Sequence, residues 1–92
     1  MKTLYFYILV DPDKQNTHKV GITKNPAQRL KNYRTAAPNS YFHSTYPIPD
    51  KIHEKNILYH LSGAFRVERE VVHGPLSIIQ NIVEGYLTDH EL

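Results

Sequence analysis

The clearest absence in this chain of 92 residues is cysteine, of which there is none. The lack of thiols excludes a disulfide scaffold, a thiolate nucleophile and a cysteine-based zinc or iron–sulfur site. Long apolar runs are absent as well, since none approaches the roughly 18 residues that span a bilayer. The short apolar stretch near the N-terminus ends at Asp11, which is not the pattern of a secretory signal. We therefore expect one cytoplasmic domain over residues 1–92 that does not enter a membrane.

Acidic residues are missing from most of the first half of the chain. Between residues 14 and 49 there is no Asp or Glu, whereas residues 50–92 carry seven acidic and four basic side chains. The net charge of +2 is thus an average over two unlike halves. A basic half indicates either an anionic partner such as nucleic acid or a solvated lysine-rich surface. Its six basic residues are Lys14, Lys19, Lys24, Arg29, Lys31 and Arg34.

Residue types along the chain predict alternating strands and helices. Runs rich in aromatic and β-branched residues favour strands, and the pair Asn25 and Pro26 favours the start of a helix. Residues 65–72 alternate in a way that fits either a strand or an extended arm. The expected elements are strands at 4–10, 17–23 and 40–48, and helices at 26–35, 50–62 and from 75 onward. This order predicts an α+β sandwich, with a small three-stranded antiparallel sheet flanked by about three helices.

Several common catalytic motifs can be excluded. The four glycines form neither a GxGxxG sequence nor a phosphate-binding loop. His53 and Glu54 begin an HExxH pattern, but Ile57 stands where the second histidine is needed. The spacing of the six histidines matches no standard zinc site.

Glu54 is the most informative single residue. Its helical neighbours Ile57, Leu58 and Leu61 place this carboxylate on the apolar stripe of its helix. A buried glutamate requires a cationic partner, which is either a metal ion or an Arg or Lys side chain. Taken alone, a salt-bridged residue at the start of a helix is the commoner explanation.

Two further pairs share a face of their elements. Arg29 and Tyr33 are four residues apart on the expected helix, so they lie on one side of it. Tyr7 lies in the first strand, and Lys19 is expected to project from its hairpin partner. Each pair has an ordinary structural explanation, namely an exposed Arg stacked over a Tyr and a core aromatic with a bonded hydroxyl.

The order and spacing of these residues resemble the GIY-YIG nuclease superfamily. Residues 5–9 correspond to the first signature, and Lys19-Val20-Gly21 corresponds to the second in the form common in phages and other viruses. Arg29 lies at the family's usual distance from that signature, and Glu54 falls where the family places its metal-binding glutamate. The resemblance covers residues 4–72 and locates the protein in a bacterium or an infected host cell.

The resemblance implies a role for each matching residue. Tyr7 would be the general base for the attacking water, and Lys19 stands in place of the second-signature tyrosine. Arg29 would contact the scissile phosphate, and Tyr33 would orient water or phosphate. Glu54 would hold one Mg²⁺ or Mn²⁺ ion, for which a single carboxylate with several waters is adequate. Because a free tyrosine has a pKa near 10, the neighbouring Lys19 is expected to lower the pKa of Tyr7.

Two departures from the family pattern stand out. Tyr5 occupies the glycine position of the first signature, and residues 65–68 lack the asparagine that often follows the metal-binding glutamate. Without an appended DNA-binding domain, substrate contacts are expected from the basic half, namely from Lys14, Lys24, Lys31 and Arg34. We therefore expect low sequence selectivity, and either a homodimer or a partner protein that supplies targeting.

Three functions remain open from the sequence. The first is a metal-dependent endonuclease that hydrolyses phosphodiester bonds, with DNA rather than RNA as the expected substrate. The second is a catalytically inactive nucleic-acid-binding module on the same fold. The third is a viral accessory protein whose acidic second half binds a host protein.

Overall fold

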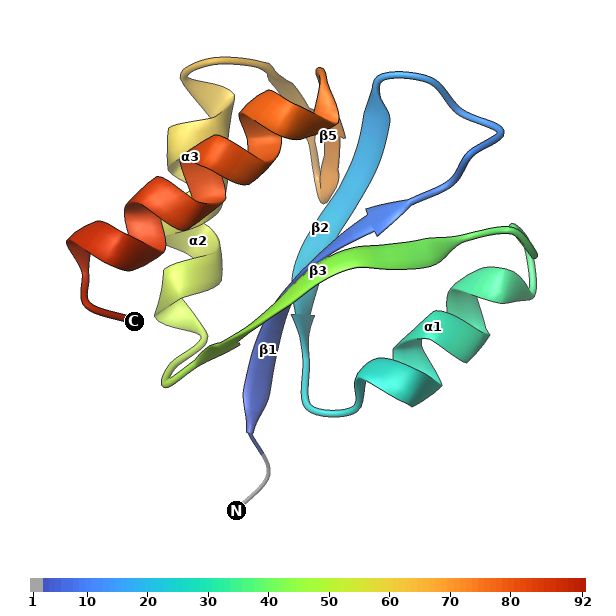
Figure 1. The fold of residues 1–92 in the computed structure, drawn as a ribbon, viewed down its shortest axis with the longest axis horizontal. Helices are drawn as coiled ribbons and strands as arrows, with labels where there is room; N and C mark the ends of the chain where they lie inside the picture. Colours follow the sequence, from blue (N-terminus) through green and yellow to red (C-terminus); the bar gives the residue numbers. More distant parts are fainter. Residues whose placement is uncertain (1–2) are drawn as a thin grey trace.

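The computed structural model describes residues 3–92 of the chain. The elements in this range are β1 (Leu4–Val10), β2 (Thr17–Thr23), α1 (Pro26–Arg34), β3 (Tyr41–Ile48), α2 (Ile52–Ser62), β4 (Arg66–Glu68), β5 (Val71–His73) and α3 (Leu76–Asp89). The α+β class, the first three strands and the three helices are therefore as predicted. Figure 1 shows how they are arranged.

The sheet is larger than predicted, because it has five antiparallel strands in the order β3-β1-β2-β5-β4. The prediction of a three-stranded sheet was wrong. Residues 65–72 are neither one strand nor an arm, because Arg69 adopts a φ of 56° and the chain reverses there. The two halves pair as the hairpin of β4 and β5, and β5 continues the sheet beside β2. Strands of three residues are too short for their alternation to be read from sequence.

Local signals at the starts of two helices act as the sequence suggests. The Asn25 side chain accepts a hydrogen bond from the Gln28 amide at 3.1 Å and caps α1, with Pro26 in the first turn. The Asp50 carboxylate accepts a hydrogen bond from the Ile52 amide at 3.0 Å ahead of α2. Both helices thus begin where a polar side chain satisfies an otherwise free backbone amide.

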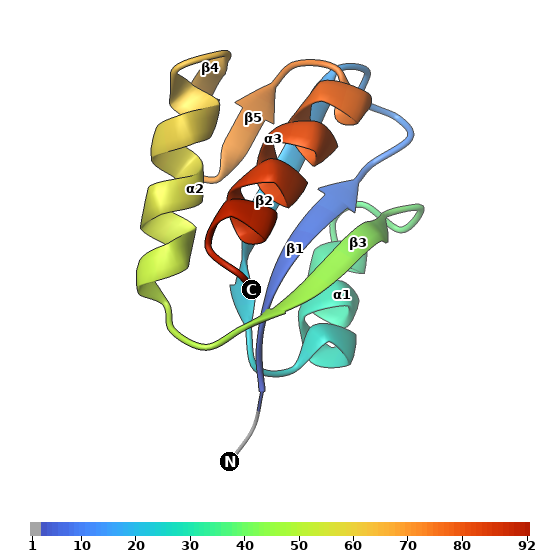
Figure 2. The same ribbon diagram turned by 60° about the vertical axis from the view of Figure 1, so that its left-hand side comes forward.

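The helices cover the two faces of the sheet unequally. Figures 1 and 2 show α2 and α3 together on one side and α1 alone on the other. On the side of α2 and α3, here called the core face, Phe6, Ile8 and Val20 join the buried cluster with residues from both helices. The side next to α1, here called the site face, carries Tyr7 and Lys19 instead. Neighbours along a strand point to opposite faces, which separates these two sets.

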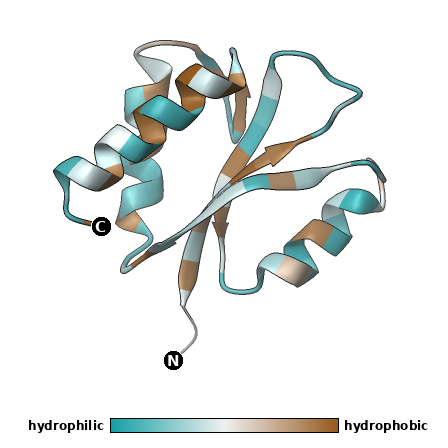
Figure 3. Cartoon of the chain, in the orientation of Figure 1, coloured by the Kyte–Doolittle hydropathy of each residue, from teal (hydrophilic) through white to brown (hydrophobic). Residues whose placement is uncertain are grey.

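Hydropathy follows the same division. In Figure 3 the central strands carry much of the apolar colour, while helix α1 is largely hydrophilic. Helix α1 has no buried residue, whereas α3 buries Ile79, Val83, Tyr86 and Leu87. The free energy of apolar burial therefore comes chiefly from the core face, and α1 is held mainly by its contacts at the site face.

An irregularity in β3 changes what the site face contains. Ile8 pairs with Ser44, but the next residue, Leu9, pairs with Phe42, so His43 is an extra residue. The shift turns Phe42 toward the site face, where its ring lies 5.1 Å from that of Tyr7. His43 turns the other way, and its Nε2 atom lies 2.8 Å from the side-chain oxygen of Gln80 on α3.

None of the helices within residues 3–92 has both the length and the apolar character that crossing a membrane requires.

Candidate active site

Two tyrosines form the centre of the site face. Tyr7 lies on β1 and Tyr33 on α1, and their hydroxyl oxygens are 2.8 Å apart in a hydrogen bond that either group can donate. Their rings meet edge to face with centroids 6.1 Å apart. Tyr7 is fully buried, whereas Tyr33 is half-buried. The pair therefore joins a buried hydroxyl to one that is nearer to solvent.

Lys19 completes one side of this centre. Its Nζ atom lies 4.9 Å from the ring centroid of Tyr33, within the range of a cation–π contact. Lys19 thus lies beside Tyr33, the more exposed member of the tyrosine pair.

A glycine in β2 leaves space for the Tyr7 side chain. Gly21 pairs with Tyr7 across the two strands. A Cβ atom at position 21 would stand 2.7 Å from the Tyr7 hydroxyl oxygen and 3.4 Å from Oε2 of Glu70. The Tyr7 hydroxyl and the Glu70 carboxylate therefore share the space over this glycine, which any larger residue would obstruct.

Arg29 and Glu54 are linked to this centre through their charges. Burial raises the pKa of Glu54, the negative charge of Glu70 raises it further, and the positive charge of Arg29 lowers it. The pKa of Tyr7 responds to Glu70 and Arg29 in the same directions. Arg29 on α1 and Glu70 thus each influence both Tyr7 on β1 and Glu54 on α2, although these residues are far apart in sequence.

Glu70 is the residue that the sequence reasoning missed. It follows Arg69 in the turn between β4 and β5, and its carbonyl oxygen accepts a hydrogen bond from the Val20 amide at 2.9 Å. That bond fixes the turn beside Gly21. The left-handed residue that precedes Glu70 leaves no mark in a sequence of ordinary residue types, so only the tertiary pairing with β2 brings this carboxylate to the site.

The pKa of Tyr7 moves opposite to expectation. Burial raises the pKa of Tyr7 well above its usual range, and the hydrogen bond with Tyr33 and the charge of Glu70 add to the rise. The opposing effect of Arg29 is smaller. The prediction that Lys19 would lower the pKa of Tyr7 was therefore wrong for the metal-free protein, in which Tyr7 is a neutral phenol at pH 7.

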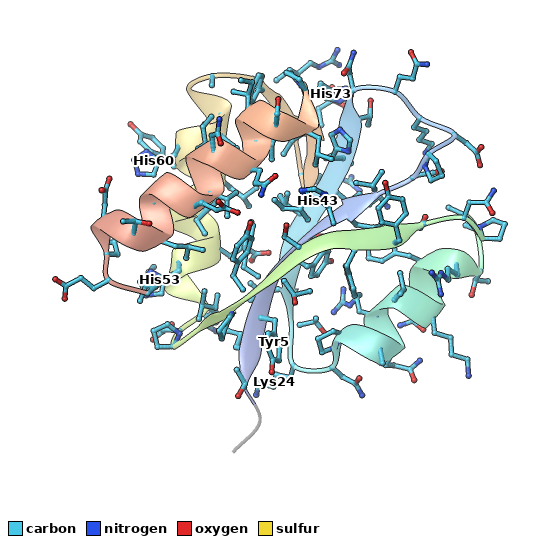
Figure 4. All side chains as sticks on the ribbon, viewed as in Figure 1. Tyr5, Lys24, His43, His53, His60 and His73 are labelled. Atoms are coloured by element: carbon cyan, nitrogen blue, oxygen red, sulfur yellow. The ribbon has the colours of Figure 1, made fainter. Side chains whose placement is uncertain are left out.

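The four additional basic residues lie in different places. Lys14 lines a pocket with Lys19 and Tyr33. Lys24 is at the far end of β2, near Tyr5 in Figure 4, and lines a separate open hollow with Lys51.

Lys31 and Arg34 both lie in the last turn of α1, where positive charge favours the helix terminus. Lys31 is exposed to solvent. Arg34 donates a hydrogen bond from Nε to the Ser40 carbonyl oxygen at 2.8 Å, so it ties α1 to the start of β3. Lys14 is thus the one of these four that lies beside the tyrosine pair.

The carboxylates allow a test of the predicted metal. Within residues 3–92, no group of three or more His, Asp or Glu side chains is arranged to hold a metal ion. Glu54 and Glu70, however, repel each other, which is one reason for the raised pKa of Glu54. Carboxylate oxygens are the type of ligand that Mg²⁺ accepts, and this ion commonly takes one or two of them and keeps several waters.

Comparison with protein families adds an independent finding. A family model described as the T5orf172 domain matches residues 4–86, nearly the whole chain. The chain belongs to the T5orf172 domain family. The T5orf172 domain is a phage-associated domain related to nuclease-like folds, and its family is often linked to endonuclease-like function.

The family match shows the kinship of this T5orf172 domain but no specific activity. It agrees with the predicted phage-associated, nuclease-like kinship, but it does not name the GIY-YIG superfamily or a specific activity. The chain has no significant match among curated proteins or among solved structures.

Proposed function

We propose that this T5orf172 domain is a metal-dependent endonuclease of the GIY-YIG type, which hydrolyses phosphodiester bonds in nucleic acid. The observation that carries the proposal is the hydrogen-bonded pair of Tyr7 and Tyr33 beside Arg29, Lys19 and Glu54. A proton acceptor, two cations and an oxygen donor for a metal are the groups that phosphodiester hydrolysis needs.

The cations bind and stabilise the phosphate. Hydrolysis builds negative charge on the phosphoryl oxygens and on the leaving oxygen, and Arg29 can offer two parallel N–H donors to them. Lys19 adds positive charge next to the Tyr33 ring. Tyr33, being nearer to solvent than Tyr7, orients the water or the phosphate with its hydroxyl.

The water oxygen bonds to phosphorus as the bond from phosphorus to the leaving oxygen breaks, and Tyr7 accepts the water's proton at its phenolic oxygen. For this the tyrosine pair must first lose a proton to solvent, and the leaving oxygen takes up a proton from solvent. Because the hydroxyls share a hydrogen bond, the remaining proton is held between two oxygens and the charge is spread over both. Arg29 favours this state and Glu70 opposes it. A Mg²⁺ or Mn²⁺ ion bound by Glu54 and Glu70 would offset that opposition and stabilise phosphate charge.

The proposed substrate is DNA, cleaved with low sequence selectivity. The basic residues that accompany the site belong to ordinary surface positions on a hairpin and a helix, where they contact phosphates rather than read bases. We further propose that the enzyme is directed to its cleavage sites either by forming a homodimer or by a separate targeting protein.

Cleavage of plasmid DNA and of a single-stranded oligonucleotide tests the proposal, with Mg²⁺ or Mn²⁺ and with EDTA. The wild type should cleave only with metal, and Arg29→Ala should lose activity on the order of 10²–10³-fold because transition-state charge is left uncompensated. Glu54→Ala should show a comparable loss.

Lys55→Ala is the matched control, since it removes an exposed positive charge next to Glu54 on the same helix and should cleave like the wild type. If cleavage survives both Arg29→Ala and Glu54→Ala, the assigned site is wrong.

An inactive nucleic-acid-binding module is the second candidate. The observation that favours it is the raised pKa of Tyr7, which opposes the role of general base. Such a module would bind oligonucleotides with a strong dependence on salt and would cleave none of them under any divalent metal.

A further inference from the structure

A pocket of about 190 Å³ opens beside the tyrosine pair. It is smaller than the roughly 300–1,000 Å³ of sites for drug-sized ligands, so its occupant is a single small unit. Its walls combine apolar side chains from β1, from the segment that follows α1 and from β5 with polar side chains, and Tyr33 and Lys19 belong to both the pocket and the site. The apolar walls are Leu9, Ala36, Ala37 and Val71.

One residue that lines this pocket carries an unsatisfied hydroxyl. Ser40 lines it and is fully buried, and its Oγ atom has no hydrogen-bond partner within residues 3–92. The backbone of Ser40 is held at both ends, because its amide donates to the Ala37 carbonyl at 3.0 Å and its carbonyl accepts from Arg34. Since buried hydroxyls normally have a partner, this fixed and unpaired one points to a polar ligand atom.

Two lysines at the rim supply positive charge. Lys14 and Lys19 both line the pocket, and the ion pairs found within residues 3–92 involve neither of them. The carboxylate at the rim, Asp11, already accepts a hydrogen bond from the Asp13 amide at 3.0 Å. Asp11 keeps its negative charge, but the two lysines outweigh it, so the net charge around the pocket is positive and suits a phosphate group.

We infer that this pocket holds the sugar and base of the nucleotide next to the scissile phosphate, with Lys14 and Lys19 on its phosphate. The inference rests on the proposed function, because it extends the substrate from the reacting phosphate to its neighbour. Apolar walls favour a nucleotide over a bare anion, since a base buries apolar surface while its edge reaches Ser40. One nucleotide unit also matches the small volume.

Binding of deoxythymidine 3′,5′-bisphosphate in EDTA tests the inference without cleavage. Backbone amide shifts measured by NMR should move at Ala36, Ala37 and Ser40 when the bisphosphate is added. Ala36 is exposed, so Ala36→Leu narrows the pocket without entering the core. This variant should weaken binding about tenfold or more, because the larger side chain would keep the base out of the pocket and away from its apolar contacts.

Ser40→Ala is a second variant that leaves the fold intact, and it should weaken binding about three- to tenfold through the lost hydroxyl. Lys55→Ala, outside the pocket, should bind as the wild type does. Inorganic phosphate should bind more weakly than the bisphosphate and should leave the Ala36 and Ala37 amides in place.

Three outcomes would overturn the inference. One is an unchanged affinity in a folded Ala36→Leu protein, the second is shifts confined to Arg29 and Glu54, and the third is inorganic phosphate that matches the bisphosphate in affinity and shifts. The parallel plasmid assay separates the two proposals. Normal cleavage by the wild type without binding of the bisphosphate in the pocket would refute only the inference about the pocket. Binding in the pocket without any cleavage would refute only the proposed nuclease activity.

Discussion

The two faces of the sheet differ in what holds them together. On the core face, strands and two helices bury aliphatic side chains with few polar groups among them. On the site face, a buried tyrosine, a lysine and a glycine meet a helix that buries no residue. The first face supplies stability through apolar burial. The second gathers charges whose mutual effects are partly unfavourable, an arrangement that is common at functional sites.

The two faces also treat similar groups in opposite ways. On the core side, the Tyr46 hydroxyl donates a hydrogen bond to Glu84 at 2.6 Å, and this bond lowers the pKa of that carboxyl. At the candidate site, burial and a neighbouring carboxylate raise the pKa of Glu54, which α2 carries. A hydrogen-bond donor stabilises the ionised form of Glu84, whereas partial burial beside another carboxylate destabilises the ionised form of Glu54. Substitutions in matched pairs can test this contrast.

The largest effect is expected at the buried tyrosine. Tyr7→Phe keeps the ring and removes the hydroxyl that is bonded to Tyr33, so the cleavage rate should fall on the order of 10²–10⁴-fold if Tyr7 moves the proton. Tyr46→Phe removes a bonded hydroxyl on the other side of the sheet and should leave cleavage unchanged. Steady-state cleavage with far-UV circular dichroism of each variant measures both. Equal losses in the two variants would contradict the division between the faces.

A smaller effect is expected at Gly21, which lies next to the Tyr7 hydroxyl. Gly21→Ala should destabilise the protein by about 1–3 kcal/mol, because its methyl group would press on the Tyr7 hydroxyl. Cleavage should fall as well, since Tyr7 must shift. Denaturant unfolding gives the change in free energy.

The control for that substitution is a glycine with open surroundings. Gly85 lies within α3 and a Cβ atom there would meet nothing within 4 Å, so Gly85→Ala should stabilise the protein by about 0.5–1 kcal/mol. A stabilising Gly21→Ala would show that the space over β2 is wider than the structure has it.

The smallest effect concerns the stability of the metal-free protein as a function of pH. The pKa of Glu54 is raised above its ordinary 4.5, so the folded state holds this proton more tightly and loses that advantage as pH rises through the folded pKa. Glu54→Gln in EDTA should therefore raise the melting temperature at pH 7. The expected rise is small, because Glu54 is only half-buried and solvent screens its repulsion from Glu70.

Glu84 has the opposite sign. Its pKa is lowered below 4.5, so its contribution to stability is present above that pH and disappears as pH falls through the folded pKa. Glu84→Gln should lower the melting temperature at pH 7, and both differences should vanish in acid below the two folded pKa values. Thermal melts from pH 3 to pH 8 check the signs, and a Glu54→Gln protein that melts lower at pH 7 would contradict the assigned environment.

Much of the fold was predictable because its signals are local. The first two strands, the capped helix α1 and the apolar stripe of α3 each show in the types and spacing of neighbouring residues. The hairpin of β4 and β5 was not predictable, because its strands have three residues and its turn depends on a left-handed Arg69. The displacement of Phe42 by the irregularity in β3 was hidden for a similar reason, since strict alternation would place it on the core face.

The candidate site divides along the same line. The list of Tyr7, Lys19, Arg29, Tyr33 and Glu54 was implied by the resemblance to the GIY-YIG superfamily, whereas residue types and spacing alone left an ordinary structural explanation for each of them. Only the tertiary structure brought Glu70 beside Gly21 and placed Lys19 over the ring of Tyr33. It also reversed the expected direction of the pKa of Tyr7. The physical reason is that burial and charge depend on distances in space, which are set when strands and helices from separate parts of the chain pack together.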